Sequence, residues 1–171
     1  MSDEQDTISA WEHLTAAHQS YLSASAACQD AIAKINSEAV DRVALLRYGL
    51  RRGGKITAFQ LAEFLTTEEK KELLNEWVLY AIHPHSDLEL ARRIIKSLPR
   101  DWLLENIETA VEPLLQEGGA DAFYGVLDFY VDLDFRDHFA RLADRATRSS
   151  DPSIHEVGEQ AIKDLQRGRP A

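Results

Sequence analysis

The feature that most constrains this chain is the spacing of its apolar residues, which follows one face of a helix rather than one face of a strand. The clearest case is a set at positions i, i+4, i+7 and i+11: Leu103, Ile107, Ala110 and Leu114. This period is typical of an amphipathic helix, whereas a half-buried strand alternates apolar and polar residues. No segment shows that alternation, and only eight glycines and five prolines interrupt the 171 residues. The sequence therefore predicts an all-α fold.

Capping signals and Gly or Pro breaks predict where the helices begin and end. Thr66–Glu69 and Ser86–Glu89 match the capping box, in which a hydroxyl caps a free N–H and a glutamate three residues later reaches back. Asp151 followed by Pro152 also favours a helix start. We predict nine helices, over residues 8–35, 38–52, 57–64, 67–82, 87–98, 100–116, 120–131, 135–148 and 152–166. The helix at 120–131 is apolar around almost its whole circumference, so we expect it at the centre of the C-terminal half.

The length of the chain bounds the number of domains. A chain of this length buries about 70% of the surface that its unfolded form exposes, which is enough for one core, and it is too short for two comfortable domains. We predict a single domain over residues 1–171, with N-terminal helices over 1–82 and a series of helix pairs over 84–166.

Two segments of the C-terminal half are similar to each other. Aligning residues 88–98 with 155–165 pairs Glu with Glu, Leu with Val, Ile with Ile, Lys with Lys and Leu with Leu, at an offset of 67 residues. That offset equals about two units of 33 to 34 residues, a length typical of helix pairs that stack into a solenoid.

The second of these segments, Ser150–Leu165, resembles the first helix of a HEAT repeat. It has an Asp-Pro start, a small residue (Gly158) where helices cross closely, and a final leucine. The resemblance covers about residues 84–166 and implies stacked antiparallel helix pairs, a HEAT-like α-solenoid, that recognise a partner instead of carrying out chemistry. The middle unit departs from the pattern, because Gly118 and Gly119 stand in place of the Asp-Pro start.

Cysteine content and the lack of long apolar runs indicate the compartment. Cys28 is the only cysteine, so no intramolecular disulfide can form, which fits a reducing cytosol. The acidic start shows no signal peptide, and no run approaches the roughly 18 apolar residues of a membrane span. We therefore expect a cytoplasmic protein with no membrane partner.

Catalytic motifs are missing from the sequence. It has no phosphate-binding glycine loop, no nucleophile elbow and no His-Glu-x-x-His. We therefore expect no catalytic residues and no cofactor, and a function other than that of an enzyme. The best metal candidates are His83 and His85, but a zinc site needs three or four ligands and only Asp87 and Glu89 lie close by. The favoured interpretation of this segment is a polar loop without a metal.

The alternative function is a small-molecule or metal-dependent enzyme. Its site would lie between the N-terminal helices and the repeats and would use His83, His85 or His138. His138 stands four residues after Asp134, a spacing at which a carboxylate could orient a histidine base. No Ser, Cys or Lys nucleophile stands beside it, which is why the binding function is preferred.

The net charge of −10 argues against a partner made of nucleic acid, because sequence-independent binding to phosphates requires Lys and Arg to neutralise them. One basic island interrupts the acidic chain: Arg47, Arg51, Arg52 and Lys55. It stands at the end of the predicted helix over 38–52, where cations complement the helix dipole. A nucleic-acid contact at this island is the weakest of the alternatives.

Carboxylates form a stripe on the predicted helix over 100–116, opposite its apolar face, at i, i+4, i+7 and i+11: Asp101, Glu105, Glu108 and Glu112. On the helix over 135–148, Asp137 and Arg141 are spaced for an i, i+4 ion pair. The HEAT resemblance implies that these two helices share one concave face. We predict that these residues bind a basic protein partner, as an adaptor does or as bacterial immunity proteins do, which are similar in size and acidity. The alternative is a solvated helix face.

The long N-terminal helix carries Leu14, Tyr21, Cys28 and Ile35 at seven-residue spacing. This pattern leaves open whether the helix packs on its own chain or on a second copy. The intervening positions His18 and Ser25 are polar, which is atypical of a coiled-coil dimer and makes it the less favoured alternative.

Overall fold

The computed structural model describes residues 2–37, 40–52, 55–83 and 87–167. Within these ranges every regular element is a helix, which confirms the all-α prediction. The helices are α1 (Ser2–Ser37), α2 (Arg42–Arg51), α3 (Lys55–Ala62), α4 (Thr67–Glu72), α5 (Leu74–Ile82), α6 (Leu88–Lys96), α7 (Arg100–Glu117), α8 (Gly119–Asp132), α9 (Arg136–Thr147) and α10 (Pro152–Gln166). None of them is both long enough and apolar enough to cross a membrane, as far as the described residues go.

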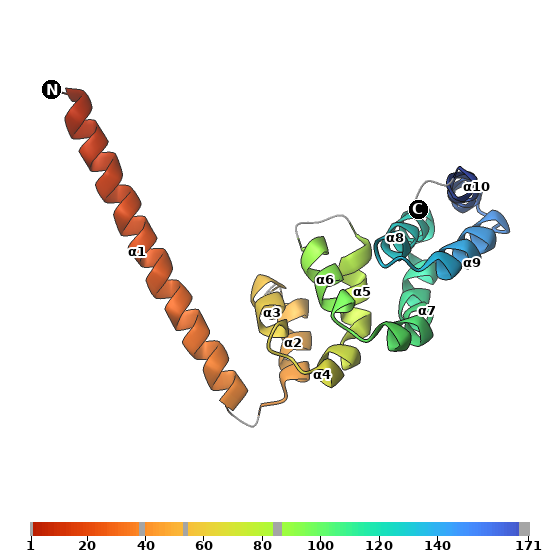
Figure 1. Ribbon diagram of the computed structural model, residues 1–171, viewed down its shortest axis with the longest axis horizontal. Coiled ribbons are helices and arrows are strands. Elements are labelled where there is room, and N and C mark those ends of the chain that lie inside the picture. The colour runs from red at the N-terminus through yellow and green to blue at the C-terminus, as the bar shows by residue number, and fades with distance from the viewer. Residues whose placement is uncertain (1, 38–39, 53–54, 84–86, 168–171) are drawn as a thin grey trace. The chain divides into compact units, whose positions relative to one another are not determined.

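The chain divides into two compact units, Met1–Arg42 and Val43–Ala171. The first unit is built on α1, a single uninterrupted helix of 36 residues (Figure 1). From Trp11 onward most of its described side chains are exposed, with Ile32 as the buried exception.

The second unit is organised around α8, which packs against α5, α7, α9 and α10. Phe129 is fully buried and Tyr130 is 2% exposed, and Phe123 and Val126 are also buried. The predicted central position of this helix is therefore confirmed. Tyr124 is the exception, since 68% of its surface faces solvent.

Two glycines allow helices of the second unit to pack backbone against backbone. A Cβ on Gly125 of α8 would lie 2.3 Å from the carbonyl oxygen of Ile82 at the end of α5. A Cβ on Gly158 of α10 would lie 2.5 Å from the backbone nitrogen of Thr147 at the end of α9. Both contacts are too short for any side chain, so these crossings depend on glycine.

The predicted helix over 67–82 is wrong in one respect, because the structure interrupts it at Leu73. The N–H of Leu73 donates to the Lys70 carbonyl at 3.3 Å, a tighter turn than an α-helix has. The same carbonyl accepts a hydrogen bond from the indole nitrogen of the buried Trp77 at 3.2 Å. The Trp77 indole of α5 thus donates a hydrogen bond to a carbonyl of α4. With this break, the described residues contain ten helices instead of the predicted nine.

The helix starts predicted from capping signals are confirmed where the structure describes them. The Thr66 hydroxyl accepts from the N–H of Glu69 at 3.3 Å, while the Glu69 carboxylate accepts from the N–H of Thr66 at 2.8 Å. The Asp151 carboxylate accepts from the N–H of Ser153 at 2.8 Å, with Pro152 in the first turn. Ser86, the start of the other predicted capping box, lies outside the described residues.

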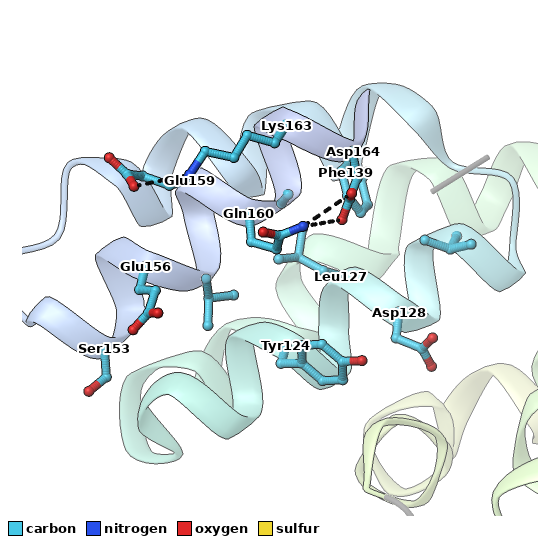
Figure 2. Close-up of a pocket in the computed structure, with 13 residues that line it drawn as sticks. Tyr124, Leu127, Asp128, Phe139, Ser153, Glu156, Glu159, Gln160, Lys163 and Asp164 are labelled. Atoms are coloured by element: carbon cyan, nitrogen blue, oxygen red, sulfur yellow. Dashed lines mark hydrogen bonds and ion pairs between the residues drawn. The ribbon is translucent and has the colours of Figure 1, made fainter. Parts of the chain in front are cut away.

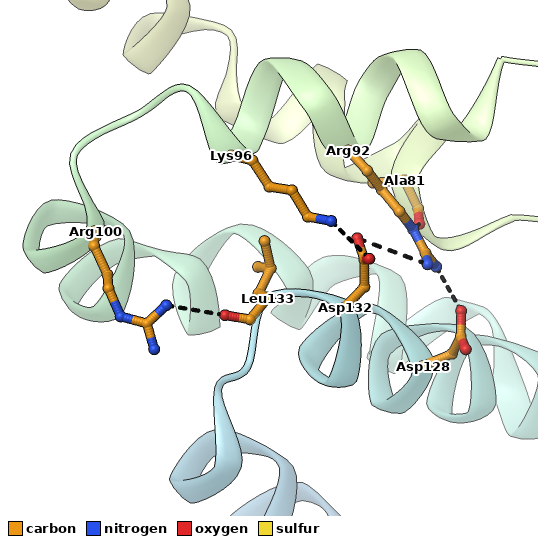
Figure 3. A network of polar contacts seen from close by, with 7 residues as sticks. All are labelled: Ala81, Arg92, Lys96, Arg100, Asp128, Asp132 and Leu133. Carbon is orange, nitrogen blue, oxygen red and sulfur yellow. Dashed lines mark hydrogen bonds and ion pairs between the residues drawn. The ribbon is translucent and has the colours of Figure 1, made fainter. Parts of the chain in front are cut away.

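A buried arginine joins α6 to α8 (Figure 3). The side chain of Arg92 is 8% exposed; its Nε donates to the Ala81 carbonyl at 3.0 Å and its guanidinium donates to Asp128 at 2.6 Å. One turn further along, Lys96 forms an ion pair with Asp132 at 2.7 Å. Both bridges connect residues 36 positions apart in the sequence.

Candidate functional site

The predicted carboxylate stripe lies on the outer face of α7. Asp101, Glu105 and Glu108 are exposed and Glu112 is partly exposed. The structure brings the last two against α9. The guanidinium of Arg141 donates to Glu108 at 2.7 and 3.0 Å, and Arg145 donates to both oxygens of Glu112 at 2.5 and 2.9 Å. Two of the four carboxylates are therefore neutralised by arginines 33 residues later in the chain.

Arg141 pairs across helices and not along its own helix. Its spacing predicted an ion pair with Asp137, but the structure places its guanidinium on Glu108 of α7. Asp137 is exposed on α9. The second pair with i, i+4 spacing on this helix does form, between Asp144 and Arg148. The stripe as the structure presents it thus has only Asp101 and Glu105 as carboxylates without a paired cation among the described residues.

The bidentate contact with Arg145 changes the acidity of Glu112. Hydrogen bonds from Arg145 hold the pKa of the Glu112 carboxyl below its ordinary value of 4.5, against a smaller opposing effect of desolvation. The same contact raises the pKa of Arg145. Both side chains are about half exposed, so solvent screens the attraction and the ion pair contributes little to stability.

Replacing Glu112 with glutamine is expected to lower the free energy of unfolding at pH 7 by less than about 1 kcal/mol. Because the pKa of Glu112 is lower in the folded state, its stabilisation is present above pH 4.5 and is lost as the pH falls through the folded-state pKa. Urea unfolding of both proteins at pH 7 and about pH 3 checks this. Glu117→Gln at the exposed end of α7 is the control and should match the parent at both values. A gap for Glu112→Gln that persists in acid would contradict the ion pair as its cause.

A hollow of about 240 Å³ lies beneath these ion pairs, with Tyr130 and His138 among the residues that line it. His138 is 6% exposed; its Nε2 lies 3.1 Å from the Leu104 carbonyl, and its Nδ1 is buried with no hydrogen-bond partner in the described part of the chain. Burial raises the pKa of the Tyr130 hydroxyl. The carboxylate of Asp134 does not orient His138, since it pairs with Arg136 at 3.2 Å. His138 is thus a buried packing residue on the side of α9 that faces α7.

The other histidines singled out by the sequence do not form a metal site where the structure can be described. His83 is exposed at the end of α5. His85 lies outside the described residues. Among the described residues, no group of three or more His, Cys, Asp or Glu side chains could hold a metal ion.

The basic island is engaged with neighbouring side chains. Arg47 forms an ion pair with Glu76 at 2.7 Å and donates to the Glu72 carbonyl at 2.8 Å. Arg52 lies 5.7 Å from the ring centre of Tyr48, and the Lys55 ammonium lies 5.1 Å from that of Tyr80. Three of the four residues of the island, Arg47, Arg52 and Lys55, thus contact neighbouring groups, and Arg51 is exposed.

A groove of about 590 Å³ runs between α8 and α10, and the sequence had not pointed to it. Figure 2 shows Tyr124 and Asp128 on the α8 side and Glu156, Gln160 and Asp164 on the α10 side. Leu127, Val131, Phe139, Val157 and Ala161 supply the apolar part of the lining.

The charge along this groove is mostly negative. Its charged lining residues are Asp128, Glu156, Glu159, Lys163 and Asp164, of which Asp128 is already paired with Arg92 of α6 at 2.6 Å. Lys163 lies 3.5 Å from Glu159 on its own helix, and the Gln160 amide donates to both Asp164 oxygens at 3.1 Å.

The sequence holds one signal for this groove: the alignment at an offset of 67 residues places the acidic Glu159 where α6 has the basic Arg92. In the structure Glu159 lines the groove and pairs with Lys163 along its own helix. What the alignment could not supply is the exposed aromatic ring of Tyr124 on the opposite wall.

Comparisons with protein-family models, with curated proteins and with solved structures find no match to this chain. The assignment of function therefore rests on the geometry of the stripe and of the groove.

Proposed function

We propose that this protein is a non-enzymatic protein-interaction module that captures a basic protein segment in the groove between α8 and α10. The helix pairs are proposed to stack as a HEAT-like α-solenoid. The observation that carries the proposal is the groove itself, with the exposed ring of Tyr124 on one wall and a surplus of carboxylates around it. The single cysteine fits the cytoplasmic location that we propose for it.

Side-chain bridges between alternate helices support the stacked arrangement. The first helices, α6 and α8, are joined by residues 36 positions apart, and the second helices, α7 and α9, by residues 33 positions apart. Equivalent helices that meet at a nearly constant offset are what a helical repeat produces, because each unit contacts its neighbour in the same way.

An exposed tyrosine in a concave, partly apolar surface is a favourable anchor for a protein partner. Tyrosine is enriched among the residues that dominate binding energy, and such residues lie in pockets surrounded by polar rims. Here the rim is acidic, and Glu156 is an exposed carboxylate for which the described residues show no paired cation. A segment with Lys or Arg beside an apolar side chain complements both features.

The groove and the predicted stripe are alternative places for such a partner, and the structure favours the groove. On α7 and α9, Glu108 and Glu112 already pair with arginines, so a basic partner would have to compete with Arg141 and Arg145. Asp101 and Glu105 remain exposed, but no pocket among those described combines them with an exposed aromatic side chain.

We expect the protein to bind a fluorescently labelled amphipathic helical peptide with Lys on one face and Leu on the other. We expect no binding of the matching peptide in which Glu replaces Lys. Tyr124→Ala should weaken the affinity by about 30-fold, the loss typical of a central anchor. The double variant Glu156→Lys with Asp164→Lys should also weaken the affinity. This loss should be larger at low ionic strength than at high ionic strength, because added salt screens the charges. Fluorescence anisotropy titrations at two salt concentrations measure these changes.

The matched control reverses two charges on the stripe, Asp101→Lys with Glu105→Lys, which changes the net charge by the same amount. The affinity of this control variant for the Lys/Leu peptide should stay within about twofold of that of the parent protein, because its changed charges act on the peptide only through the long-range electrostatic field. A larger loss for the stripe variant than for the groove variant would place the partner on α7. Equal binding of the Lys/Leu and Glu/Leu peptides, or binding of neither, would contradict the proposed function.

A further inference from the structure

The helix α1, on which the first unit is built, exposes several large apolar side chains to solvent. Trp11 and Tyr21 are each 68% exposed and Leu14 is 60% exposed. A helix of 36 residues is about 54 Å long. An exposed apolar surface of this extent commonly marks an interface.

The apolar residues of α1 follow a heptad pattern with a consistent division by size. In the seven-residue series Leu14, Tyr21, Cys28 and Ile35, all members but Cys28 are large. Three positions after the first two of them stand alanines, Ala17 and Ala24, both exposed. In coiled-coil notation the large residues occupy position a and the alanines occupy position d, the two positions that face a partner helix.

We infer that α1 pairs with α1 of a second copy of this chain, in antiparallel orientation. In antiparallel pairs an a residue of one helix faces a d residue of the other. If residue n faces residue 38 − n, Leu14 lies against Ala24 of the second copy and Tyr21 lies against Ala17 of the second copy. Leu14 and Tyr21 thus each meet an alanine, and the two-fold axis repeats both of these layers.

The same register centres the two helices on each other. Its axis passes beside residue 19, within half a residue of the midpoint of Ser2–Ser37, so the helices overlap over almost their whole length. Trp11, at the border of the seam, then lies opposite Ala27 of the second copy, which again sets a large residue against a small one. The large and small residues of α1 are thus placed so that two copies of this helix fit each other when they cross at their middles. This is why the partner is inferred to be another α1.

The distribution of charge favours the antiparallel orientation over the parallel one. Residues 2–12 carry four carboxylates and no Lys or Arg, while Lys34 stands near the other end of the helix. Parallel pairing would place the two acidic ends side by side, and it would also set Leu14 against Leu14 and Ala17 against Ala17, which alternates wide and narrow layers. Antiparallel pairing separates the acidic ends and aligns the helix dipoles favourably.

The area available is of the size that a stable dimer needs. Trp11 and Tyr21 each contribute about 150–250 Å² when buried, a large part of the roughly 800 Å² per partner in a standard interface. This inference concerns α1 alone and does not depend on the groove between α8 and α10.

Sedimentation of the full chain over a range of concentrations tests the pairing. The parent should have twice the 19.3 kDa mass of one chain. Tyr21→Glu should raise the dissociation constant of the dimer by at least about 30-fold. The control is Leu22→Glu, the same change at the adjacent exposed position outside the seam, which should leave the dimer intact. Circular dichroism shows whether each variant keeps its helix content.

Cysteine cross-linking tests the orientation. With Cys28→Ser as background, Leu14→Cys together with Ala24→Cys should give a disulfide-linked dimer under oxidant, since residues 14 and 24 are too far apart along one helix to bond to each other. The mass of one chain at all concentrations, or equal effects of Tyr21→Glu and Leu22→Glu, would overturn the pairing. A dimer linked through Cys28 to Cys28 in the parent protein would overturn the antiparallel orientation.

Discussion

Replacing Arg92 with alanine is expected to lower the free energy of unfolding by about 3 kcal/mol or more, which is the cost of removing one partner from a buried ionic network. The side chain of Arg92 is 8% exposed, and its donors reach the Ala81 carbonyl and the Asp128 carboxylate. Its removal also takes a cation, at 3.9 Å, from a buried oxygen of Asp132 that has no hydrogen bond among the described residues.

Burial decides where most of this cost arises. Asp128 is 54% exposed, so water screens its ion pair with Arg92 and can replace the lost donor. The Ala81 carbonyl and the inner oxygen of Asp132 are less accessible, and the alkyl part of Arg92 leaves a cavity next to Phe129. The loss should therefore appear mainly as unsatisfied buried polar groups and lost packing.

Urea unfolding followed by circular dichroism measures the effect of Arg92→Ala. The neighbouring Arg93 is exposed on the same helix and provides the control, since Arg93→Ala removes the same charge and should change stability by no more than about 0.5 kcal/mol. Equal stability of the two variants would show that the α6–α8 bridge does not hold these helices together.

Adding a single methyl group to Gly125 is expected to destabilise the protein by about 2–3 kcal/mol. The new Cβ would lie 2.3 Å from the carbonyl oxygen of Ile82 and 3.2 Å from its carbonyl carbon. Both are backbone atoms, which cannot rotate out of the way as the end of a side chain can. The clash must therefore separate α8 from α5, and each of these helices packs against four others.

The same substitution at Gly49 is the matched control and should have the opposite sign. Gly49 lies within α2, where a Cβ would meet only the Cβ of Ala58 at 3.8 Å, an ordinary contact. Alanine is a better helix former than glycine by about 1 kcal/mol, so Gly49→Ala should stabilise the protein slightly. Thermal and urea unfolding of the two variants compare a close helix crossing with an open helix face, and a stabilised Gly125→Ala variant would contradict the crossing of α5 and α8.

Local features of the sequence predict most of the helices of this protein. The periodicity of the apolar residues and the caps at Thr66 and Asp151 depend on neighbours within a few positions, and the structure confirms them. The break at Leu73 could not be predicted in this way. It depends on the indole of Trp77 reaching a carbonyl one turn before the break, which is a matter of packing and not of local preference.

The candidate site shows the same division between local and distant information. The spacing of Asp137 and Arg141 favoured a pair along one helix, but Glu108 comes within 2.7 Å of Arg141 from a helix 33 residues earlier. An isolated i, i+4 pair is worth only a few tenths of a kcal/mol, so a well-placed carboxylate on an adjacent helix can outcompete it. The groove beside Tyr124 also escaped prediction, because it depends on how far α8 and α10 stand apart.

The regular offset between the helix pairs has a consequence for how the second unit folds. The side chains that join α6 to α8 and α7 to α9 are only 33 to 36 residues apart, so each contact closes a short loop. Helical proteins with such low contact order fold in microseconds to milliseconds, and in a repeat array folding can begin at one pair and spread to its neighbours. Stability need not be uniform along such an array: α10 packs on both α8 and α9, whereas α2 and α3 make few contacts with the other helices, so the N-terminal edge of this unit is expected to open before the C-terminal edge.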